Sequence, residues 1–553
     1  MISDRSQDQI VFFGCGDSIR SSVEAETVGS KAARLVRLAE EGIRTPPGFV
    51  LGVSFCRDYF ARGERLPEGF AELLSQSTER LGNATGLAFG GERRPLLLSV
   101  RSGAAVSMPG MLDTILNVGL TNRTLSALVC LTGNPRHAWD SYRRLVQSFG
   151  ESAYGLPAEG FEGLVDAQLA SEKASTAGEL DATALREITQ QSLAWFESQT
   201  HQAFPQSPDR QLVEAVEAVF RSWRSPRAVE FRRLRGLESL PGSAVTVQAM
   251  AYGNLGGNSG SGVAFTRDPA TGEKTLYLDF LPNAQGEDIV GGRRRLEGAA
   301  VLKRILPDVY RQLLEIADQL ERLFKDAQDF EFTVQEGRLY ILQTRDAKRT
   351  PLAALRVACD LVAEGLIDER VALDRLKDYN LDRISAVRLS PPVGLEPLCR
   401  GTPASSGAAT GRAALTPEAA IALAAKGCSP ILVRNDITTC DIAGLAASAG
   451  IITSRGGRTS HAAVVARQLD KVCVVGCREL SVAAGSQSLQ LGDRRLSEGD
   501  WISVDGQSGE IYAGQVEVSE MRPTSYLAQV ANWKARSPER NIERPASLEG
   551  VKT

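Results

Sequence analysis

A histidine in an unusual local sequence is the residue best placed to do chemistry. The chain has three histidines, and His461 lies between a turn and an apolar repeat in SRGGRTSHAAVVARQL. Gly456 and Gly457 predict a flexible turn, and Thr459 or Ser460 is a natural N-cap, so His461 is expected in the first turn of a helix. The positive end of a helix dipole disfavours an imidazolium. The pattern therefore predicts a neutral histidine with a nucleophilic nitrogen near pH 7.

The residues around His461 are of the types that bind a phosphoryl group. Backbone N–H groups at the start of a helix bind phosphate, and Arg455 and Arg458 add charge-assisted donors. These features suit a transient phosphohistidine, although a polar residue that caps a buried helix would give the same pattern. The buried face of the helix is predicted to consist of Ala462, Val465, Ala466 and Leu469.

A second group of polar residues lies on a predicted β-hairpin. The strands FEFTV and LYILQT flank QEGR, which predicts a turn at Gly337. If the two strands pair symmetrically about Gly337, the two residue numbers of each pair add up to 674. Glu331 is then opposite Gln343. Asp329 then shares their face because side chains alternate along a strand. Hard divalent cations prefer such oxygen ligands, but solvated acids on an exposed hairpin would show the same spacing.

A third candidate is a loop rich in glycine and serine, LLLSVRSGAAVSMPGMLDTILNVGL. Such a loop after a strand exposes backbone N–H groups to phosphates, and Arg101 supplies a bidentate donor. A flexible turn beside a surface arginine is the alternative interpretation. The loop by itself does not decide between them.

Positioning these groups requires several elements and more than one domain. The 553 residues predict three or four domains, and strand-like and helical stretches alternate, which indicates an α/β (α+β) multidomain fold. The glycine- and serine-rich segment YGNLGGNSGSG is interpreted as a loop between two strands, and the spacing of Leu352, Leu355, Cys359 and Val362 predicts a helix. The Pro-, Gly- and Ser-rich stretch LSPPVGLEPLCRGTPASSG marks a boundary. We predict a first α/β domain over 1–348 with a helical insertion over about 121–240, a helical linker over 349–397, a second α/β domain over 398–517, and a partly ordered tail over 518–553.

Composition excludes several classes of function. Lys and Arg total 63 and Asp and Glu total 67, so the net charge of −4 gives no bulk attraction to nucleic acids. No apolar run approaches the roughly 18 residues of a membrane helix, and no signal segment begins the chain, so we expect a cytoplasmic protein without a membrane partner. The nine cysteines are scattered and are expected to be free thiols. His137 and His201 are interpreted as structural.

Longer stretches resemble a known family. The segment TSRGGRTSHAAVVARQLDKVCVVGC is similar to the phosphohistidine segment of the pyruvate phosphate dikinase and phosphoenolpyruvate synthase family. GTPASSGAATG, PILVRNDITTCDIAGL and EGDWISVDGQSGEIYAG resemble other parts of the same swivelling domain. The resemblance implies that His461 is phosphorylated on nitrogen. Thr459 matches a threonine that a regulatory kinase modifies in some dikinases, with a plain N-cap as the alternative. The resemblance also implies a phosphohistidine loop, which consists of Gly456, Gly457, Arg458, Thr459 and Ser460.

The first domain resembles the nucleotide-binding domain of the dikinase more than that of the synthase. The similar stretches are the loop containing Arg101, QAMAYGNLGGNSGSGVAFTRDPATGEK and NAQGEDIVGG. They imply an ATP-grasp domain, with Arg101 also catalytic. Asp279 stands where the dikinase usually carries a glutamate, which is one methylene longer. The nucleotide-binding residues implied are Lys31, Arg101, Asp329, Glu331, Gln343 and Arg345, and those for Mg²⁺ are Glu331, Gln343 and Asp279.

The resemblance implies an ATP-dependent phosphotransferase. Mg-ATP would phosphorylate His461 and leave AMP, with inorganic phosphate as co-substrate or water as the synthase-like alternative. The similarity covers about residues 10–517, and the remaining residues are too few for the pyruvate-binding barrel of about 250 residues that follows in the family. The acceptor is therefore expected to be a small molecule or to bind to a separate protein.

Two other hypotheses stay open. One is a catalytically reduced, ATP-binding regulatory or interaction protein, and the other is the nucleotide half of a split dikinase. A homodimer is the default expectation for a soluble enzyme.

Overall fold

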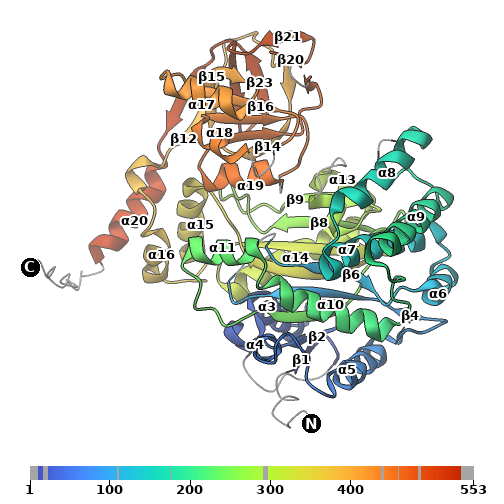
Figure 1. Ribbon diagram of the computed structural model, residues 1–553. Coiled ribbons are helices and arrows are strands. Elements are labelled where there is room, and N and C mark those ends of the chain that lie inside the picture. Colours follow the sequence, from blue (N-terminus) through green and yellow to red (C-terminus); the bar gives the residue numbers. More distant parts are fainter. Residues whose placement is uncertain are drawn as a thin grey trace, which may run out of the picture. The chain divides into compact units, whose positions relative to one another are not determined.

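The computed structural model describes residues 10–16, 23–106, 108, 111–174, 176–290, 297–437, 441–458, 460–483 and 487–536. Helices and strands are mixed throughout, which confirms an α/β multidomain fold (Figure 1). The chain forms two compact units. The N-terminal unit consists of Met1–Ala264, Leu278–Ile316 and Asp329–Asp346, and the C-terminal unit consists of Phe265–Tyr277, Ala317–Gln328 and Ala347–Thr553. The chain therefore passes between the units several times.

The first sheet of the N-terminal unit has five antiparallel strands in the order β1-β2-β7-β5-β6. In β5, Arg101 lies between Thr246 of β7 and Thr114 of β6. The strands are β1 (Ile10–Phe13), β2 (Gly48–Leu51), β7 (Ala244–Ala249), β5 (Leu98–Gly103) and β6 (Thr114–Val118), with a small parallel pair β3 (Ala88–Phe89) and β4 (Pro95–Leu96). The helices that accompany it are α2 (Ala25–Val28), α3 (Ser30–Glu40), α4 (Val53–Ala61) and α5 (Phe70–Thr85).

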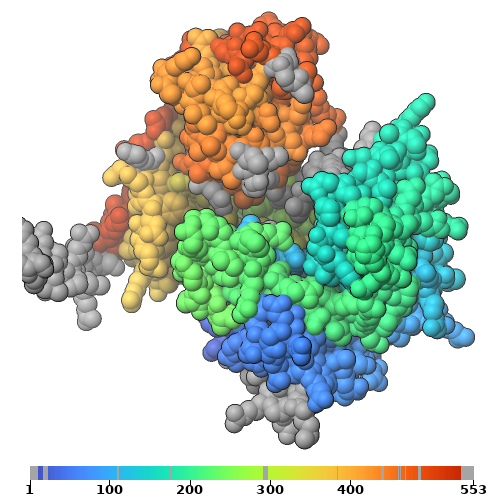
Figure 2. Space-filling model, viewed as in Figure 1, coloured from blue at the N-terminus to red at the C-terminus, as the bar shows by residue number. Residues whose placement is uncertain are grey.

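Helices fill the stretch between β6 and β7. Capping side chains start most of them, because Thr121, Asn134, Asp181, Ser207 and Ser225 each accept a hydrogen bond from a backbone N–H of the first turn. In the space-filling view these helices, coloured from light blue to green, make up much of the visible surface of their unit (Figure 2). They are α6 (Asn122–Thr132), α7 (Pro135–Tyr154), α8 (Ala158–Glu172), α9 (Ala182–Thr200), α10 (Pro208–Ser222) and α11 (Pro226–Arg235).

The second sheet has the order β11-β10-β8-β9 and contains a correction to the sequence analysis. YGNLGGNSGSG was interpreted as a loop, but β8 begins at Gly260 within it. A Cβ at Gly260 would lie 2.3 Å from the Phe280 ring, and one at Gly262 would lie 2.2 Å from the Phe332 ring. These glycines therefore make room for two stacked rings rather than for a turn. The elements are β8 (Gly260–Phe265), β9 (Tyr277–Pro282), β10 (Gln328–Gln335), β11 (Arg338–Asp346), α12 (Gly286–Val290), α13 (Ala299–Ile305) and α14 (Pro307–Phe324).

The largest sheet of the C-terminal unit has eight strands in the order β13-β23-β22-β15-β16-β17-β18-β14. β15 to β18 run parallel to their successive neighbours, and apolar clusters cover both faces. The strands are β13 (Cys399–Arg400), β14 (Thr402–Ser405), β15 (Ala408–Ala414), β16 (Pro430–Arg434), β17 (Gly450–Thr453), β18 (Val472–Val475), β22 (Trp501–Asp505) and β23 (Glu510–Ala513). Around them lie α17 (Pro417–Ala425), α18 (Ile442–Ala447), α19 (His461–Gln468) and the sheet of β19 (Leu480–Val482), β20 (Ser488–Leu491) and β21 (Arg494–Ser497).

A helical group and a two-stranded ribbon complete the C-terminal unit. The predicted stripe of the helix after residue 350 is confirmed, because Leu355 and Cys359 are buried and Leu352 and Val362 pack against them. Trp533, within the predicted tail, joins this cluster. The ribbon pairs the strand that precedes the eight-stranded sheet with one that follows it. The elements are α15 (Pro351–Ala363), α16 (Glu369–Leu376), η1 (Leu381–Arg383), β12 (Ala386–Ser390), β24 (Glu517–Met521) and α20 (Thr524–Arg536).

Candidate active site

Lys31 is positioned by a close approach of two backbone segments. Gly29, with φ +81°, precedes α3, and a Cβ there would lie 2.5 Å from the carbonyl oxygen of Gly103 at the end of β5. The backbone N–H and hydroxyl of Ser30 donate to the carbonyl of Ala104 at 3.0 and 3.2 Å. Only glycine fits this contact. It sets the first turn of α3, with Lys31, beside the strand that carries Arg101.

An ion pair ties the same helix to the hairpin. Arg34 of α3 donates to the carboxylate of Asp346 at the end of β11, at 2.8 Å. Burial lowers the pKa of Lys31 below its ordinary value; Arg101 and Arg345 lower it further, while Glu331 raises it. The first sheet, α3 and the hairpin thus bring Lys31, Arg101, Glu331 and Arg345 within electrostatic reach of one another.

Arg101 faces two carboxylates without pairing to either. Burial lowers the pKa of Arg101, and the charges of Glu331 and Glu287 raise it. Within the described part of the chain, the side chains of Lys31, Arg101 and Glu331 form no hydrogen bond or ion pair with one another or with other residues. A structural ion pair would satisfy its own charges. Buried cations without such partners are the arrangement expected where a polyanion binds.

Asp329 and Arg345 form an ion pair that was not predicted from the sequence. Nε of Arg345 donates to Oδ2 of Asp329 at 2.7 Å. Burial alone would lower the pKa of Arg345, but Asp329 and Glu331 raise it above its ordinary value. The signal was present in the sequence, because the register that pairs Glu331 with Gln343 also pairs Asp329 with Arg345. Asp329 therefore holds Arg345 in place at this face.

The turn of this hairpin differs from its prediction. Glu336 and Gly337, at φ +49° and +78°, form a two-residue turn between Gln335 and Arg338, whereas the predicted register centred on Gly337. In β11, every second residue is buried as far as Ile341. The next buried residue is Thr344, three positions later, so the alternation shifts by one residue. Such a change of phase indicates one extra residue in the strand. With this extra residue, strands that are joined by a two-residue turn also bring Asp329 and Arg345 together at their far ends.

The residues assigned to Mg²⁺ fit a cation that is shared with phosphates. Phe280 and Phe332 stack on one face of the second sheet, so Asp279 and Glu331, their neighbours in sequence, point to the other face. Among the described residues, no three His, Cys, Asp or Glu side chains form a metal-binding cluster. Mg²⁺ bound to phosphates needs only one or two carboxylates. Glu331 and Asp279 therefore fit such an ion, and Gln343 lies in β11 of the same sheet.

The helix that carries His461 begins as the sequence predicts, with Ser460 as its N-cap. The hydroxyl of Ser460 accepts a hydrogen bond from the N–H of Ala463 at 3.4 Å, and its own N–H donates to the carbonyl of Gly457 at 3.0 Å. Gly456, at φ +98°, leaves room for Ser460, since a Cβ there would lie 3.0 Å from it. Thr459 lies outside the described residues.

The buried face of α19 differs from its prediction at one end. Ala462, Ala463 and Ala466 are buried, whereas Leu469 is exposed. The helix ends at Gln468, and the chain then turns through Asp470 at φ +52°. Leu469 was predicted by extending the helical period past this end, where the period no longer applies.

The two arginines of the loop before His461 have different surroundings. Arg455 is exposed. The guanidinium of Arg458 lies 4.1 Å from the ring centre of Tyr277, and its buried Nε has no hydrogen-bond partner within the described residues. Arg458 is therefore held by an aromatic ring rather than by a carboxylate.

An acidic and basic cluster, also missed, positions Glu287 near Arg101. Arg144 of α7 pairs with Asp140 at 3.0 Å, with Glu287 at 3.1 Å and with Asp288 at 2.7 Å. Burial alone would raise the pKa of Asp140, but Arg144 and Arg143 hold it well below its usual range. These residues line a cavity of about 400 Å³. The i, i+4 spacing of Asp140 and Arg144 in NPRHAWDSYRR was the available signal.

His137 packs in the core beside this cluster. Its Nδ1 lies 2.9 Å from Oδ1 of Asn254, and its ring meets Tyr252 edge to face at 4.7 Å. Burial lowers the pKa of His137 to about 4, so the ring is neutral near pH 7. The geometry supports the structural interpretation.

Two family models match the domains that carry these sites. Residues 63–310 match the model described as pyruvate phosphate dikinase, AMP/ATP-binding domain, and residues 428–509 match the PEP-utilising enzyme, mobile domain. The chain belongs to the pyruvate phosphate dikinase family.

Similar dikinases come from bacteria and plants. Pyruvate, phosphate dikinase of Clostridium symbiosum is 41% identical over 509 residues, which are 92% of this chain and 58% of the relative. Pyruvate, phosphate dikinase 1, chloroplastic, of Arabidopsis thaliana is 40% identical over 530 residues, 96% of this chain and 55% of the relative. The dikinase of Rhizobium meliloti is 38% identical over 557 residues, 98% of this chain and 62% of the relative. The chain thus spans a little over half the length of these relatives.

The dikinase family models cover the two sites unequally. The AMP/ATP-binding model includes Arg101 and Asp279, and the mobile-domain model includes His461 and its loop. Lys31 and the hairpin lie outside both models but within the match to the dikinase of Rhizobium meliloti, which takes in 98% of the chain. Of the described helices, none is long and apolar enough to cross a membrane.

Proposed function

We propose that this chain transfers a pyrophosphoryl group from Mg-ATP to His461 and releases AMP. The observation that carries the proposal is the convergence of Lys31 and Arg101 at the Gly29–Gly103 contact, beside Glu331 and without structural partners. The helix that starts at His461 in the mobile domain supplies the acceptor nitrogen. Family membership supports the pairing of these two sites in one reaction.

Each residue has a role that follows from its charge and position. Lys31 and Arg101 bind the phosphates and neutralise the negative charge that develops on them. Asp329 orients Arg345 toward the same face. Glu331, Gln343 and Asp279 would hold Mg²⁺, which supplies charge neutralisation and alignment of the phosphate oxygens. No other protein carboxylate is needed for such an ion.

The transfer step uses the nucleophilic nitrogen of His461. Its lone pair forms a bond to the β-phosphorus as the bond from that phosphorus to the oxygen bridging the α- and β-phosphates breaks, and AMP leaves with that oxygen. Cleavage by inorganic phosphate, or by water, then leaves a phosphoryl group on His461. The positive end of the α19 dipole keeps the free imidazole neutral before attack and favours the anionic group afterwards.

The second half of the reaction requires an acceptor that binds outside the two matched domains. We propose that His461 passes its phosphoryl group to a small molecule or to an acceptor on another protein. The Pro- and Gly-containing segment before β13 and the β12–β24 ribbon connect the mobile domain to the rest of the C-terminal unit. These connections support movement of His461 between two partners.

Isotope transfer tests this function. The protein is incubated with Mg²⁺ and ATP labelled at the β- or γ-position, and the nucleotide product is identified. We expect label on the wild-type protein from either position without phosphate, β-label retained and γ-label released after phosphate or water cleavage, and AMP as product. His461→Ala should take up no label. Unlabelled wild-type protein, or equal labelling of His461→Ala, would contradict the proposal.

A further inference from the structure

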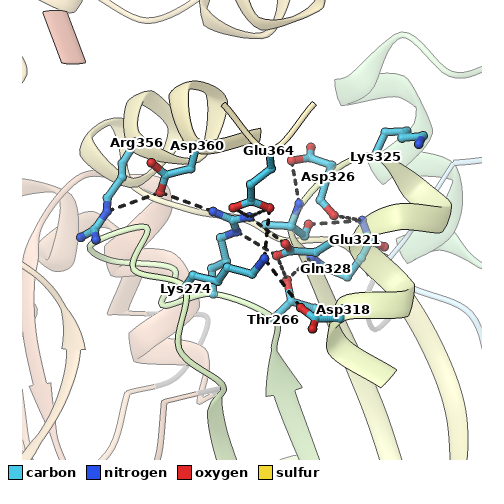
Figure 3. Close-up of polar contacts among 12 residues, drawn as sticks. Thr266, Lys274, Asp318, Glu321, Lys325, Asp326, Gln328, Arg356, Asp360 and Glu364 are labelled. Carbon is cyan, nitrogen blue, oxygen red and sulfur yellow. Dashed lines mark hydrogen bonds and ion pairs between the residues drawn. The ribbon is translucent and has the colours of Figure 1, made fainter. Parts of the chain in front are cut away.

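The segment Phe265–Tyr277 forms a fixed platform within the C-terminal unit. Arg267 is 1% exposed and donates to Glu321 at 2.8 and 2.9 Å and to Glu364 at 2.9 Å. Asp360 of α15 lies 3.4 Å from the same guanidinium. Figure 3 labels Glu321 of α14, Asp360 of α15 and Glu364, the residue that follows α15. All three carboxylates pair with Arg267. Breaking this buried network is costly, so the platform is held firmly against both helices.

The platform also bonds to the edge of the eight-stranded sheet. The hydroxyl of Tyr277 donates to the carbonyl of Pro403 in β14 at 2.6 Å, and the hydroxyl of Ser406 donates to the carbonyl of Ala270 at 3.1 Å. Tyr277 also packs against Phe265 within an apolar cluster. The Tyr277 ring is therefore fixed at both its polar and its apolar end.

Arg458 contacts the Tyr277 ring, and its N–H groups stay available as hydrogen-bond donors. Its guanidinium lies 4.1 Å from the ring centre, which is a cation–π contact. A guanidinium carries five N–H donors, and an aromatic ring supplies none of the oxygen acceptors that they need. Within the described residues Arg458 has no ion pair, and its Nε has no hydrogen-bond partner. An arginine serving only structure would normally satisfy these donors.

The backbone fixes where these donors are presented. Arg458 lies three residues before the start of α19, between Gly457, whose carbonyl accepts from Ser460, and the N-cap itself. The start of that helix is the place where a phosphoryl group on His461 would be held. A guanidinium fixed at this point is ready for charge-assisted hydrogen bonds to phosphoryl oxygens.

We propose that Tyr277 is a positioning residue that holds Arg458 to bind the phosphoryl group on His461. The inference rests on the proposed function and names a residue of the platform that contributes to it. Tyr277 acts through Arg458 and does not touch ATP. It stabilises the phosphorylated protein while this contact is made, and the contact must break when the mobile domain carries the group to its acceptor.

The test measures how long phosphohistidine survives after the protein is labelled and free ATP is removed. The variants are Tyr277→Leu, which removes the ring, and Tyr277→Phe, which keeps the ring but loses the bond to Pro403. Arg458→Gln removes the charge, and the double variant Tyr277→Leu/Arg458→Gln completes a cycle. Tyr310→Leu is the matched control because its ring also lies near a cation, Lys303 at 5.9 Å, away from the phosphohistidine loop.

Tyr277→Leu and Arg458→Gln should each raise the hydrolysis rate by about 2- to 30-fold, the range expected for losing one cation–π contact or its cation. Tyr277→Phe should stay near the wild-type rate, and the double variant should hydrolyse no faster than Arg458→Gln. The KM for ATP should not change in Tyr277→Leu or Tyr277→Phe. Full additivity in the cycle, or a wild-type rate in Arg458→Gln, would overturn the inference, the latter even if Tyr277→Leu fails to fold. Absence of label in the wild-type protein would instead overturn the proposed function.

Discussion

Lys31 shows how its surroundings change the pKa of a single side chain. Burial and the neighbouring Arg101 and Arg345 lower its pKa, and Glu331 partly restores it. The residue pattern alone did not identify Lys31; the family resemblance did. Its partners come from β5 and from the hairpin, distant in sequence, and only the folded Gly29–Gly103 contact brings them together. By contrast, strand alternation is enough to put Asp329 and Glu331 on the same side of β10.

Nucleotide affinity should therefore depend on pH through Lys31. Only the protonated amine binds phosphate well, so affinity for ATP should fall as pH rises through the lowered pKa of Lys31, earlier than for an exposed lysine. Glu331→Gln removes the charge that raises this pKa and should move the fall to lower pH. Calorimetric titration of ATP in EDTA, across a pH series, measures the effect without a metal contribution. Lys31→Arg, whose guanidinium stays protonated across the whole series, should remove the fall. An identical profile in Glu331→Gln would contradict the assignment.

For the helices and strands, packing determined which predictions from sequence patterns were correct. The stripe of α15 was predicted because a long helix with one buried face has a regular period. Gly260 and Gly262 were taken for loop residues because glycine usually signals a turn, whereas here two aromatic rings occupy the space of the missing side chains. Leu469 was misplaced because the end of a short helix depends on the turn that follows it.

The start of α3 should be intolerant of any side chain. Gly29→Ala places a Cβ against the carbonyl of Gly103 and should cost at least about 2 kcal/mol of unfolding free energy. Gly42→Ala is a close control, since Gly42 has a similar φ of +72° but nothing within 4 Å. It should cost only about 1 kcal/mol. Urea unfolding measures the loss of stability in both variants, and ATP titration measures their nucleotide affinity. Equal losses of stability would show that the Gly29–Gly103 contact does not decide which residue fits at position 29.

The buried network of Arg267 should dominate the stability of its unit. Glu321→Gln removes a charge that is 2% exposed and should lower the unfolding free energy by about 3 kcal/mol, because Arg267 stays buried with fewer partners. Asp308→Asn breaks an exposed pair with Arg311 and should leave the denaturant midpoint unchanged. The urea midpoint, followed by fluorescence, is the measurement. A midpoint for Glu321→Gln equal to that of Asp308→Asn would refute the role of the network.

At the scale of the whole molecule, the units are not continuous stretches of chain. Linker composition predicted consecutive domains. In the structure, Phe265–Tyr277 and Ala317–Gln328 lie within the stretch predicted as the first domain but belong to the C-terminal unit. Composition marks linkers, but it carries no record of contacts between segments a hundred residues apart. The fold class and the helix-rich stretch could be predicted; the interleaving could not.

Fragments should reveal this interleaving. A fragment ending at Asp346 keeps Phe265 and Ala327 but loses Val357 and Leu361, which cover them. It should melt several degrees below a fragment ending at Asp368, which retains α15, because each large apolar side chain contributes about 1.5–3 kcal/mol when buried. Differential scanning calorimetry of the two fragments provides the comparison. Equal melting temperatures would mean that α15 contributes nothing to the earlier segments.

The β12–β24 ribbon has a consequence for engineering. Ala386 pairs with Met521 and Ser390 with Glu517, so the polypeptide enters and leaves the eight-stranded sheet side by side. A module whose two ends are adjacent can be inserted or replaced as one piece. The eight-stranded sheet can therefore be exchanged for that of another protein through two neighbouring splice points, Ser390 and Glu517, without cutting the chain within the N-terminal unit.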